Sequence, residues 1–209
     1  MTYSVKELYV TLQGEGCHTG RPAVFCRFTG CNLWSGREQD RPTASCRFCD
    51  TDFVGTDGEG GGQFDTARDL AETVASMWSG DGHPFVVCTG GEPLLQLDIM
   101  LIEELRIVGF EIAVETNGTL PVPPGIDWVC VSPKANTDVI VRNGDELKLV
   151  YPQEGLAPEM VSDWNFNHFF LQPMDGPGID EHRASAIEYC IQHSQWSLSA
   201  QMHKFVGIR

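Results

Sequence analysis

The sequence predicts an α/β protein whose core is an incomplete, partial TIM-type parallel β/α barrel of about six strands, fewer than the eight of a full barrel. Three observations support this prediction. Short apolar runs recur along the chain, helix-like segments separate several of them, and four of the runs end in polar segments. With 209 residues and 42% hydrophobic content the chain can bury one core, so we expect a single domain over residues 1–209.

The first part of the chain contains one expected strand, at residues 23–28. Residues 32–45 are polar with weak periodicity, which predicts a long functional loop with room for one short helix. Residues 57–63 (DGEGGGQ) are expected to be flexible because of their composition. The apolar residues that follow have helical spacing, so a helix is expected at residues 65–78.

The rest of the chain contains further predicted strands and helices. The helices are expected at residues 95–108 and 180–193. The strands are expected at residues 85–89, 111–115, 128–132, 146–151 and 169–172. Because buried strands alternating with helices are typical of parallel sheets, we expect one parallel sheet.

Polar segments follow four of these strands, at residues 89–93 (TGGEP), 115–118 (ETNG), 132–134 (SPK) and 172–175 (QPMD). Ligands bind at the C-terminal strand ends of barrels and open α/β sheets, so these segments predict a shared site. For any one segment alone, turn chemistry is the better explanation, since these are ordinary turn residues. Their repetition at four strand ends favours the shared site.

Charge and composition argue against several kinds of partner. The chain has 14 Lys and Arg against 29 Asp and Glu, a net charge of -15, which argues against binding of nucleic acid. The first ten residues lack a leader pattern, and no apolar stretch approaches the roughly 20 residues that span a bilayer. We therefore expect a cytoplasmic protein with no membrane partner, whose eight cysteines stay reduced.

Three cysteines carry the strongest chemical signal, in the pattern C-x14-C-x2-C: Cys31, Cys46 and Cys49. Thiolates are the usual ligands of a [4Fe-4S] cluster, and three of them would leave one iron open to a small molecule. A structural zinc site that recruits Cys26 or His18 is an alternative, as are buried cysteines without metal. The sequence offers no second cysteine pair, which zinc would normally require.

Residues near these motifs suit a small polar ligand. Phe48 can stack on a flat ring, although it also suits a protein core. Gly90 allows close approach of the backbone beside Glu92, whose carboxylate suits a protonated amino group; a tight turn is the alternative. Arg27 lies in an apolar strand, where its charge needs a partner such as a substrate carboxylate.

Together these motifs resemble those of the radical S-adenosylmethionine (SAM) enzymes, and among them most closely the 7-carboxy-7-deazaguanine synthase family. The resemblance runs from about residue 5 to the end, in residues 13–16 (QGEG), 30–33 (GCNL), 46–51 (CRFCDT), 90–93 (GGEP), 132–134 (SPK) and 201–204 (QMHK). The usual superfamily spacing is C-x3-C-x2-C. The longer spacing here indicates a modified cluster-binding loop at residues 31–49.

The resemblance implies a radical SAM fold, with a [4Fe-4S] cluster and SAM as cofactors. SAM would chelate the open iron, and one electron would cleave it to methionine and a 5′-deoxyadenosyl radical. In this family the radical acts on 6-carboxy-5,6,7,8-tetrahydropterin in a Mg²⁺-dependent ring contraction. Ammonia leaves and 7-carboxy-7-deazaguanine forms, on the route to queuosine and related 7-deazapurines. The chain is therefore expected to be a carbon-nitrogen lyase.

The resemblance also implies the roles of individual residues. Thr51 is expected to bind Mg²⁺, although Asp50 and Thr51 equally suit a turn or a helix cap. Gln13 and Glu15 are expected to read the amide and amino edge of the pterin, although a polar surface loop is the alternative. The residues expected to bind SAM are Phe48, Cys49, Asp50, Glu92, Ser132, Pro133, Lys134, Gln172, Pro173, Met174 and Asp175. Those expected to bind the substrate are Leu12, Gln13, Gly14, Glu15, Arg27 and Gly90. No other catalytic residue is predicted, and His203 and Lys204 receive no role.

By analogy with the family we expect a flavodoxin-type electron donor and a homodimer. Two alternatives remain open. A different radical SAM enzyme, such as a glycyl-radical activase, would share the cluster residues but would need no pterin and Mg²⁺ pocket. A non-enzymatic zinc or iron-sulfur protein would use the same cysteines without SAM.

Overall fold

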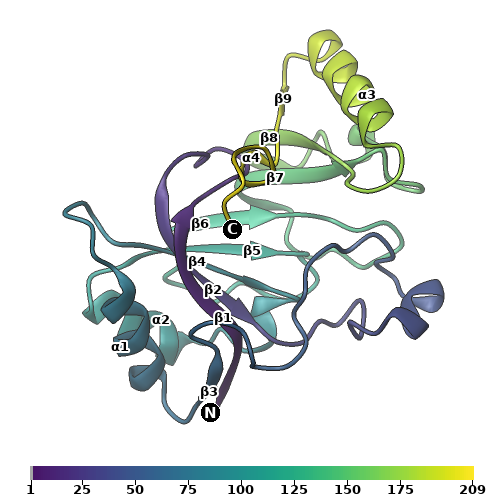
Figure 1. Cartoon of the computed structure of the whole chain (residues 1–209). Coiled ribbons are helices and arrows are strands. Elements are labelled where there is room, and N and C mark those ends of the chain that lie inside the picture. The colour runs from purple at the N-terminus through teal and green to yellow at the C-terminus, as the bar shows by residue number, and fades with distance from the viewer. Residues whose placement is uncertain (1) are drawn as a thin grey trace.

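A single sheet organises the computed structural model, which describes residues 2–209 (Figure 1). Its nine strands lie in the order β3-β1-β2-β4-β5-β6-β7-β8-β9. They are β1 (Tyr3–Leu12), β2 (Pro22–Phe28), β3 (Gly62–Phe64), β4 (Phe85–Gly90), β5 (Glu111–Thr116), β6 (Trp128–Val131), β7 (Asn143–Tyr151), β8 (Asn165–Pro173) and β9 (Trp196–Leu198). The pairs from β2 to β9 are parallel, whereas β1 pairs antiparallel with β2 and β3.

The predicted fold class is confirmed. The six predicted strands correspond to β2, β4, β5, β6, β7 and β8, which are consecutive neighbours in the sheet. The sheet has two separate edges, β3 and β9, so the barrel is incomplete, as expected. The central strands are apolar along their whole length because both faces of the sheet are covered. In β4, for example, the first four side chains, from Phe85 to Cys88, are all buried.

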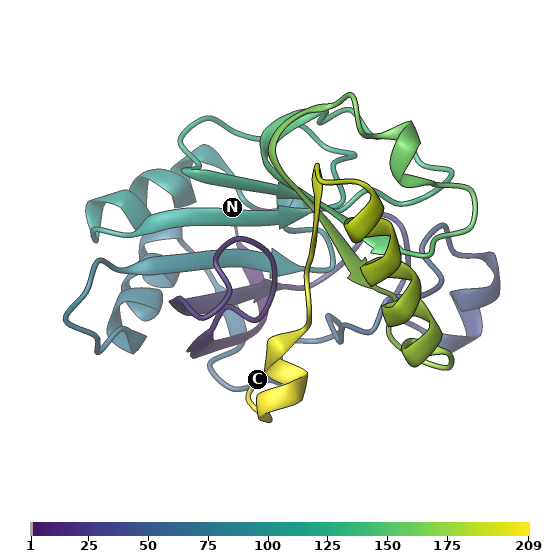
Figure 2. The ribbon, with the colours of Figure 1, turned by 90° about the horizontal axis from the view of Figure 1, so that it is seen from above.

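Helices cover opposite ends of the sheet (Figures 1 and 2). Helices α1 (Ala67–Met77) and α2 (Ile99–Ile107) pack together beside β1, β2 and β5, over one core that includes Leu70, Val74 and Leu101. Helix α3 (Ile179–Gln192) packs on β8 and β9 over a second core. The short elements are the 3-10 helices η1 (Glu38–Thr43), η2 (Pro93–Leu95) and η3 (Pro158–Met160) and the helix α4 (Met202–Val206).

Some boundaries differ from the predictions for local reasons. The helix expected from residue 95 begins at Ile99, because the Asp98 side chain accepts a hydrogen bond from Leu101 N and caps α2 there. Strands β7 and β8 begin earlier than expected, at Asn143 and Asn165, since their polar first residues resemble loop sequence.

Among the strands and α-helices of the described residues, four had no sequence prediction: β1, β3, β9 and α4. A bulge between Val5 and Glu7 interrupts the alternation of β1, so its period-2 pattern is weak. Strand β3 includes Gly62 and Gln63, where the expectation of a flexible segment is wrong, because these residues pair with β1. Strands β3 and β9 have three residues each, too few for a periodic signal.

Among residues 2–209, none of the helices combines the length and the apolar character needed to cross a bilayer.

Candidate active site

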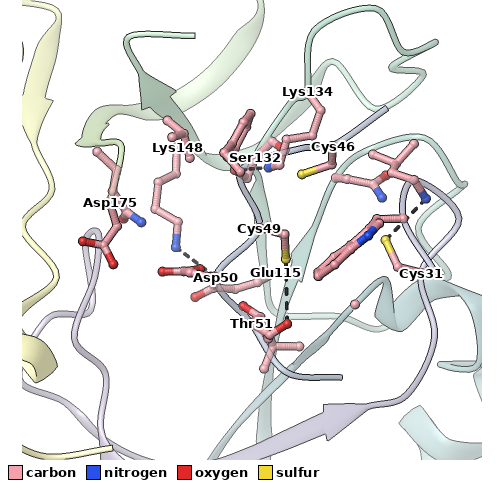
Figure 3. Close-up of a pocket in the computed structure, with 18 of the residues that line it drawn as sticks. Cys31, Cys46, Cys49, Asp50, Thr51, Glu115, Ser132, Lys134, Lys148 and Asp175 are labelled. Atoms are coloured by element: carbon pink, nitrogen blue, oxygen red, sulfur yellow. Dashed lines mark hydrogen bonds and ion pairs between the residues drawn. The ribbon is translucent and has the colours of Figure 1, made fainter. Parts of the chain in front are cut away.

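Polar and sulfur-bearing side chains line a cavity at the carboxyl ends of the central strands (Figure 3). All four predicted strand-end segments contribute to its wall, through residues 89–91, 115–117, 132 and 134, and 172–175. This is the edge of a parallel sheet at which ligands generally bind. The structure therefore brings the four segments together, as the sequence predicts.

Cys31, Cys46 and Cys49 line this cavity together, despite the long spacing between the first two. The intervening loop closes on itself, because Leu33 O accepts hydrogen bonds from Ser45 N at 3.1 Å and from Cys46 N at 3.4 Å. The loop contains η1, so the prediction of a long loop with one short helix is confirmed. The extra residues bulge outward while the three thiols stay at one cavity.

The thiols and the cavity together fit a cluster with an open corner. A hydrogen bond between the Cys46 and Cys49 thiols lowers the pKa of Cys49 to about 6 and raises the pKa of Cys46, and burial raises the pKa of Cys31. The thiolate is the form that binds metal. Three thiols on the wall of one cavity match the three protein ligands of a cluster whose fourth iron is open to a small molecule.

The two extra ligands considered for zinc lie elsewhere. The His18 ring packs against Trp128 and Phe85, at 4.3 Å and 5.2 Å between ring centroids. Cys26 is buried in the core beneath α1 and α2. Within residues 2–209, no three His, Cys, Asp or Glu side chains are grouped to hold a single ion. The side chains therefore do not provide a zinc site completed by Cys26 or His18.

Most residues expected to bind SAM lie on the cavity wall: Phe48, Cys49, Asp50, Ser132, Lys134, Gln172, Pro173, Met174 and Asp175. The Lys134 ammonium donates to Ser132 O at 2.6 Å and to Ser132 Oγ at 2.7 Å, and lies 5.9 Å from the centre of the Phe48 ring. Burial lowers the pKa of Lys134. Pro133 is buried and is not among the lining residues.

Glu92 lies behind the wall, fully buried and outside the set of lining residues. Its carboxylate accepts hydrogen bonds from Leu94 N at 3.0 Å, Thr116 Oγ1 at 2.7 Å and Asn117 N at 2.8 Å. Burial raises the pKa of Glu92 despite these donors. These contacts tie the exit of β4 to the exit of β5, and the expectation that Glu92 binds SAM stays a prediction.

Gly90 is required by the close approach of two backbones. Its φ is +139°, a conformation that side chains rarely adopt, and a Cβ there would lie 2.2 Å from Phe28 O. A glycine at this position lets β4 end against β2, directly beside the cavity.

A second cavity adjoins the first, and the two have wall residues in common. It is lined by five of the six residues expected to bind substrate: Leu12, Gln13, Gly14, Glu15 and Arg27. Gly90, the sixth, lines the first cavity. The two cavities share Glu15, Asp50, Thr51, Thr89, Glu115 and Gln201. Apart from Glu92 and Pro133, the residues expected to bind the cofactor and the substrate therefore line two adjoining cavities, with Thr51 in the wall that both share.

Arg27 has partners within the protein. Its Nε donates to Glu7 Oε1 at 2.8 Å, and its Nη2 donates to the Tyr9 hydroxyl at 2.9 Å. Glu7 therefore already balances the charge of Arg27, and the expectation that Arg27 binds a substrate carboxylate stays a prediction. Arg27 still faces the second cavity.

A buried cluster of charged side chains, which the sequence did not predict, connects β7 to Glu15 and Glu115 at the base of the site. Lys148 Nζ, on β7, lies 2.7 Å from Glu15 Oε2 and 2.8 Å from Glu115 Oε2. Gln13 Nε2 donates to Glu115 Oε1 at 2.9 Å, and Gln172 Nε2 donates to Glu15 Oε1 at 3.1 Å. Burial alone would lower the pKa of Lys148, but the two carboxylates raise it well above its usual value. A lysine within the apolar run of β7 is the signal that sequence reasoning missed.

The C-terminal segment forms another wall of the site, and Lys204 makes two ion pairs there. Its ammonium lies 2.7 Å from Asp50 Oδ2 and 2.6 Å from Asp175 Oδ2, joining the cluster loop to the exit of β8. Gln201 Nε2 donates to Glu15 Oε1 at 2.9 Å. His203 lines the second cavity and lies against Gly14. A Cβ added to Gly14 would lie 2.3 Å from His203 Nδ1. The QMHK segment is therefore part of the site.

Glu15 is expected to make stability depend on acid pH. Burial alone would raise its pKa, but Lys148 and Gln201 outweigh burial and lower it from 4.5 to about 2. The stabilisation is therefore complete above pH 4.5 and disappears as the pH falls toward 2. We expect Glu15→Gln to lower the free energy of unfolding by about 3 kcal/mol at pH 7. The loss should become smaller as the pH falls from 4.5 toward 2. Urea unfolding of both proteins from pH 7 downward measures the difference; a difference independent of pH would contradict it.

Comparison with protein families places this geometry in context. Residues 39–143 match the family described as the radical SAM superfamily. The match begins inside the loop between Cys31 and Cys46, where the spacing departs from the usual pattern.

Curated relatives match over the whole chain. A 7-carboxy-7-deazaguanine synthase of Bordetella pertussis is 60% identical, with 100% of both chains covered. Proteins of the same name from Bradyrhizobium diazoefficiens and Caulobacter vibrioides are 59% and 60% identical, again with 100% of both chains covered. Among solved structures, QueE from Escherichia coli matches with a TM-score of 0.73 and 29% identity, over 97% of this chain and 95% of that one.

Proposed function

The chain belongs to the 7-carboxy-7-deazaguanine synthase family of the radical SAM superfamily, and we propose that its site converts 6-carboxy-5,6,7,8-tetrahydropterin to 7-carboxy-7-deazaguanine. This ring contraction releases ammonia and serves queuosine and 7-deazapurine biosynthesis. One observation carries the proposal for the substrate: the cysteine-lined cavity and the cavity of Gln13, Glu15 and Arg27 adjoin and share wall residues.

The radical SAM superfamily implies a [4Fe-4S] cluster and SAM, which together supply one-electron radical chemistry. Cys31, Cys46 and Cys49 would hold the cluster. Phe48 and residues 172–175 line the cavity beside them and would hold SAM there. The protein's own part is to bind and orient the two ligands and to exclude water from the space between them.

The second cavity suits the polar edges of a carboxypterin. The acceptors of Glu15 and the amide of Gln13 match the alternating donors and acceptors of a pterin edge. A guanidinium has five N–H groups, and the contacts of Arg27 with Glu7 and Tyr9 use only part of them. Arg27 therefore retains donors for the substrate carboxylate.

Thr51 is our proposed Mg²⁺ ligand, because it lies at the boundary between the two cavities. We expect Thr51→Ala to keep its iron and to lose about tenfold in turnover at low Mg²⁺. The measurement is turnover against Mg²⁺ concentration, with iron content determined on the same samples. Thr51→Ser, which keeps the hydroxyl, is the matched control and should respond as the wild type does. An unchanged Mg²⁺ response in Thr51→Ala would remove the residue from this role.

We also propose a flavodoxin-type one-electron donor, a homodimer and a cytoplasmic location. The eight cysteines are free thiols in the structure, which suits a reducing compartment. The homodimer and the donor are supported by analogy with the family.

The test is anaerobic reconstitution with iron and sulfide, followed by SAM, a reductant, Mg²⁺ and 6-carboxytetrahydropterin. The expected product is 7-carboxy-7-deazaguanine, identified by mass spectrometry. Cleavage of SAM without this product would favour a different radical SAM reaction, such as that of a glycyl-radical activase. Stoichiometric zinc without acid-labile sulfide would end the radical assignment for the site.

A further inference from the structure

The loop between Cys31 and Cys46 has its own small packing centre. Trp34 is buried in it and contacts Phe53 edge to face, with 5.5 Å between ring centroids. The guanidinium carbon of Arg41 lies 4.0 Å from the centre of the Trp34 ring. An arginine stacked on an indole face is held in orientation by the ring. Arg41 is therefore a fixed group in the longest irregular segment of the site.

The N–H groups of Arg41 point in two directions. Nη1 donates to Arg47 O at 2.9 Å and to Cys49 O at 3.1 Å. Nε and Nη2 donate to the two carboxylate oxygens of Glu38, at 2.7 Å and 2.6 Å. The two carbonyls lie on either side of Phe48, within the turn that carries Cys46 and Cys49. The Arg41 guanidinium thus joins η1 to the turn between Cys46 and Cys49.

The other two arginines of this region make no comparable contacts. The Arg47 side chain donates only to Ala44 O, at 3.3 Å, and both Arg37 and Arg47 are exposed. Neither forms an ion pair with any residue in the range 2–209. Arg37 therefore offers a control that removes the same charge from the same loop.

We propose that Arg41 is a positioning residue for the cluster, which holds the Cys46–Cys49 turn in the shape that binds iron. The inference rests on the proposed function, since it assigns a purpose to the modified loop. Backbone carbonyls that lose their donor must find another partner, and in a short turn this rotates the peptide units that carry the ligands. Groups that orient metal ligands contribute roughly 10–100-fold to metal retention.

The test compares Arg41→Met with Arg37→Met after identical reconstitution. We expect Arg41→Met to release iron to a chelator at least about tenfold faster than the wild type, and Arg37→Met to stay within about twofold. Arg41→Lys keeps the charge but lacks the planar fork, so it should lie between Arg41→Met and the wild type. The readouts are iron and sulfide per chain, the rate of iron release, and the electron paramagnetic resonance signal of the reduced cluster. Thermal unfolding of each apoprotein checks that the fold is intact.

Equal release rates in Arg41→Met and Arg37→Met would overturn the proposal. If Arg41→Met does not fold, Arg41→Lys provides the test. Iron release from Arg41→Lys at the wild-type rate would show that the planar guanidinium and its stacking on Trp34 are not needed, and would overturn the proposal. Failure of the proposed function looks different. In that case the wild-type protein would form a cluster but would not make the deazaguanine, and the comparison of iron release among the variants would be unaffected. A wild-type protein that forms no iron-sulfur cluster would overturn both.

Discussion

Replacing Cys31 with alanine is expected to abolish the cluster and the activity together. Three corner irons need one outer ligand each, and Cys31 is the only one of the three thiols supplied from outside the Cys46–Cys49 turn. The two remaining thiols leave a second iron without a protein ligand. We expect less than about one tenth of the wild-type iron and sulfide after reconstitution, and no detectable SAM cleavage.

The matched control is Cys190→Ala. Cys190 lies on α3, packed against the second core and away from the cavity, so its loss should leave iron content and turnover unchanged. Iron and sulfide analysis, the absorbance of the cluster and product formation are measured on both variants. A Cys31→Ala protein with a full cluster would mean that another side chain supplies the third ligand.

Replacing Lys148 with methionine is expected to cause the largest loss of stability in the site. Its side chain is 4% exposed and lies between Glu15 and Glu115, so the substitution leaves two carboxylates facing each other. Removing one partner of a buried ion pair typically costs about 3–5 kcal/mol. Displacement of Gln13 and Glu15 should also lower kcat/KM by about 100-fold. Urea unfolding and steady-state kinetics measure the two effects.

Two further variants make this prediction specific. Arg68→Met removes an exposed ion pair with Glu72 and should therefore cost far less stability than Lys148→Met. Adding Glu115→Gln to Lys148→Met removes one of the opposed carboxylates and should recover part of the lost stability. If Lys148→Met were as stable as Arg68→Met, the buried cluster would have no role in folding.

The parts of the site that could be predicted are those whose chemistry is visible within a few residues. Cys46 and Cys49 sit in one turn, and the polar segments at the strand ends are contiguous in sequence. The parallel sheet was predictable for a similar reason, because each strand is a continuous apolar run. For these features, local pattern and three-dimensional position coincide.

The parts that could not be predicted depend on distant pairing. Lys148 acquires its partner Glu15 from 133 residues away, so nothing beside it in the chain indicates its role. Glu92 shows the converse: its sequence context suggests a ligand, whereas its carboxylate is directed to backbone and side-chain donors of β5. Arg27 likewise found its partner, Glu7, on a strand whose bulge weakened the sequence pattern.

The contacts of the C-terminal segment have a consequence for the order of assembly. Gln201 meets Glu15 across 186 residues, and Lys204 meets Asp50 across 154. Closing such long loops is entropically unfavourable until the intervening sheet has brought the ends together. We therefore expect this wall to form last during folding. The cysteine-lined cavity should therefore stay open on that side until late in folding.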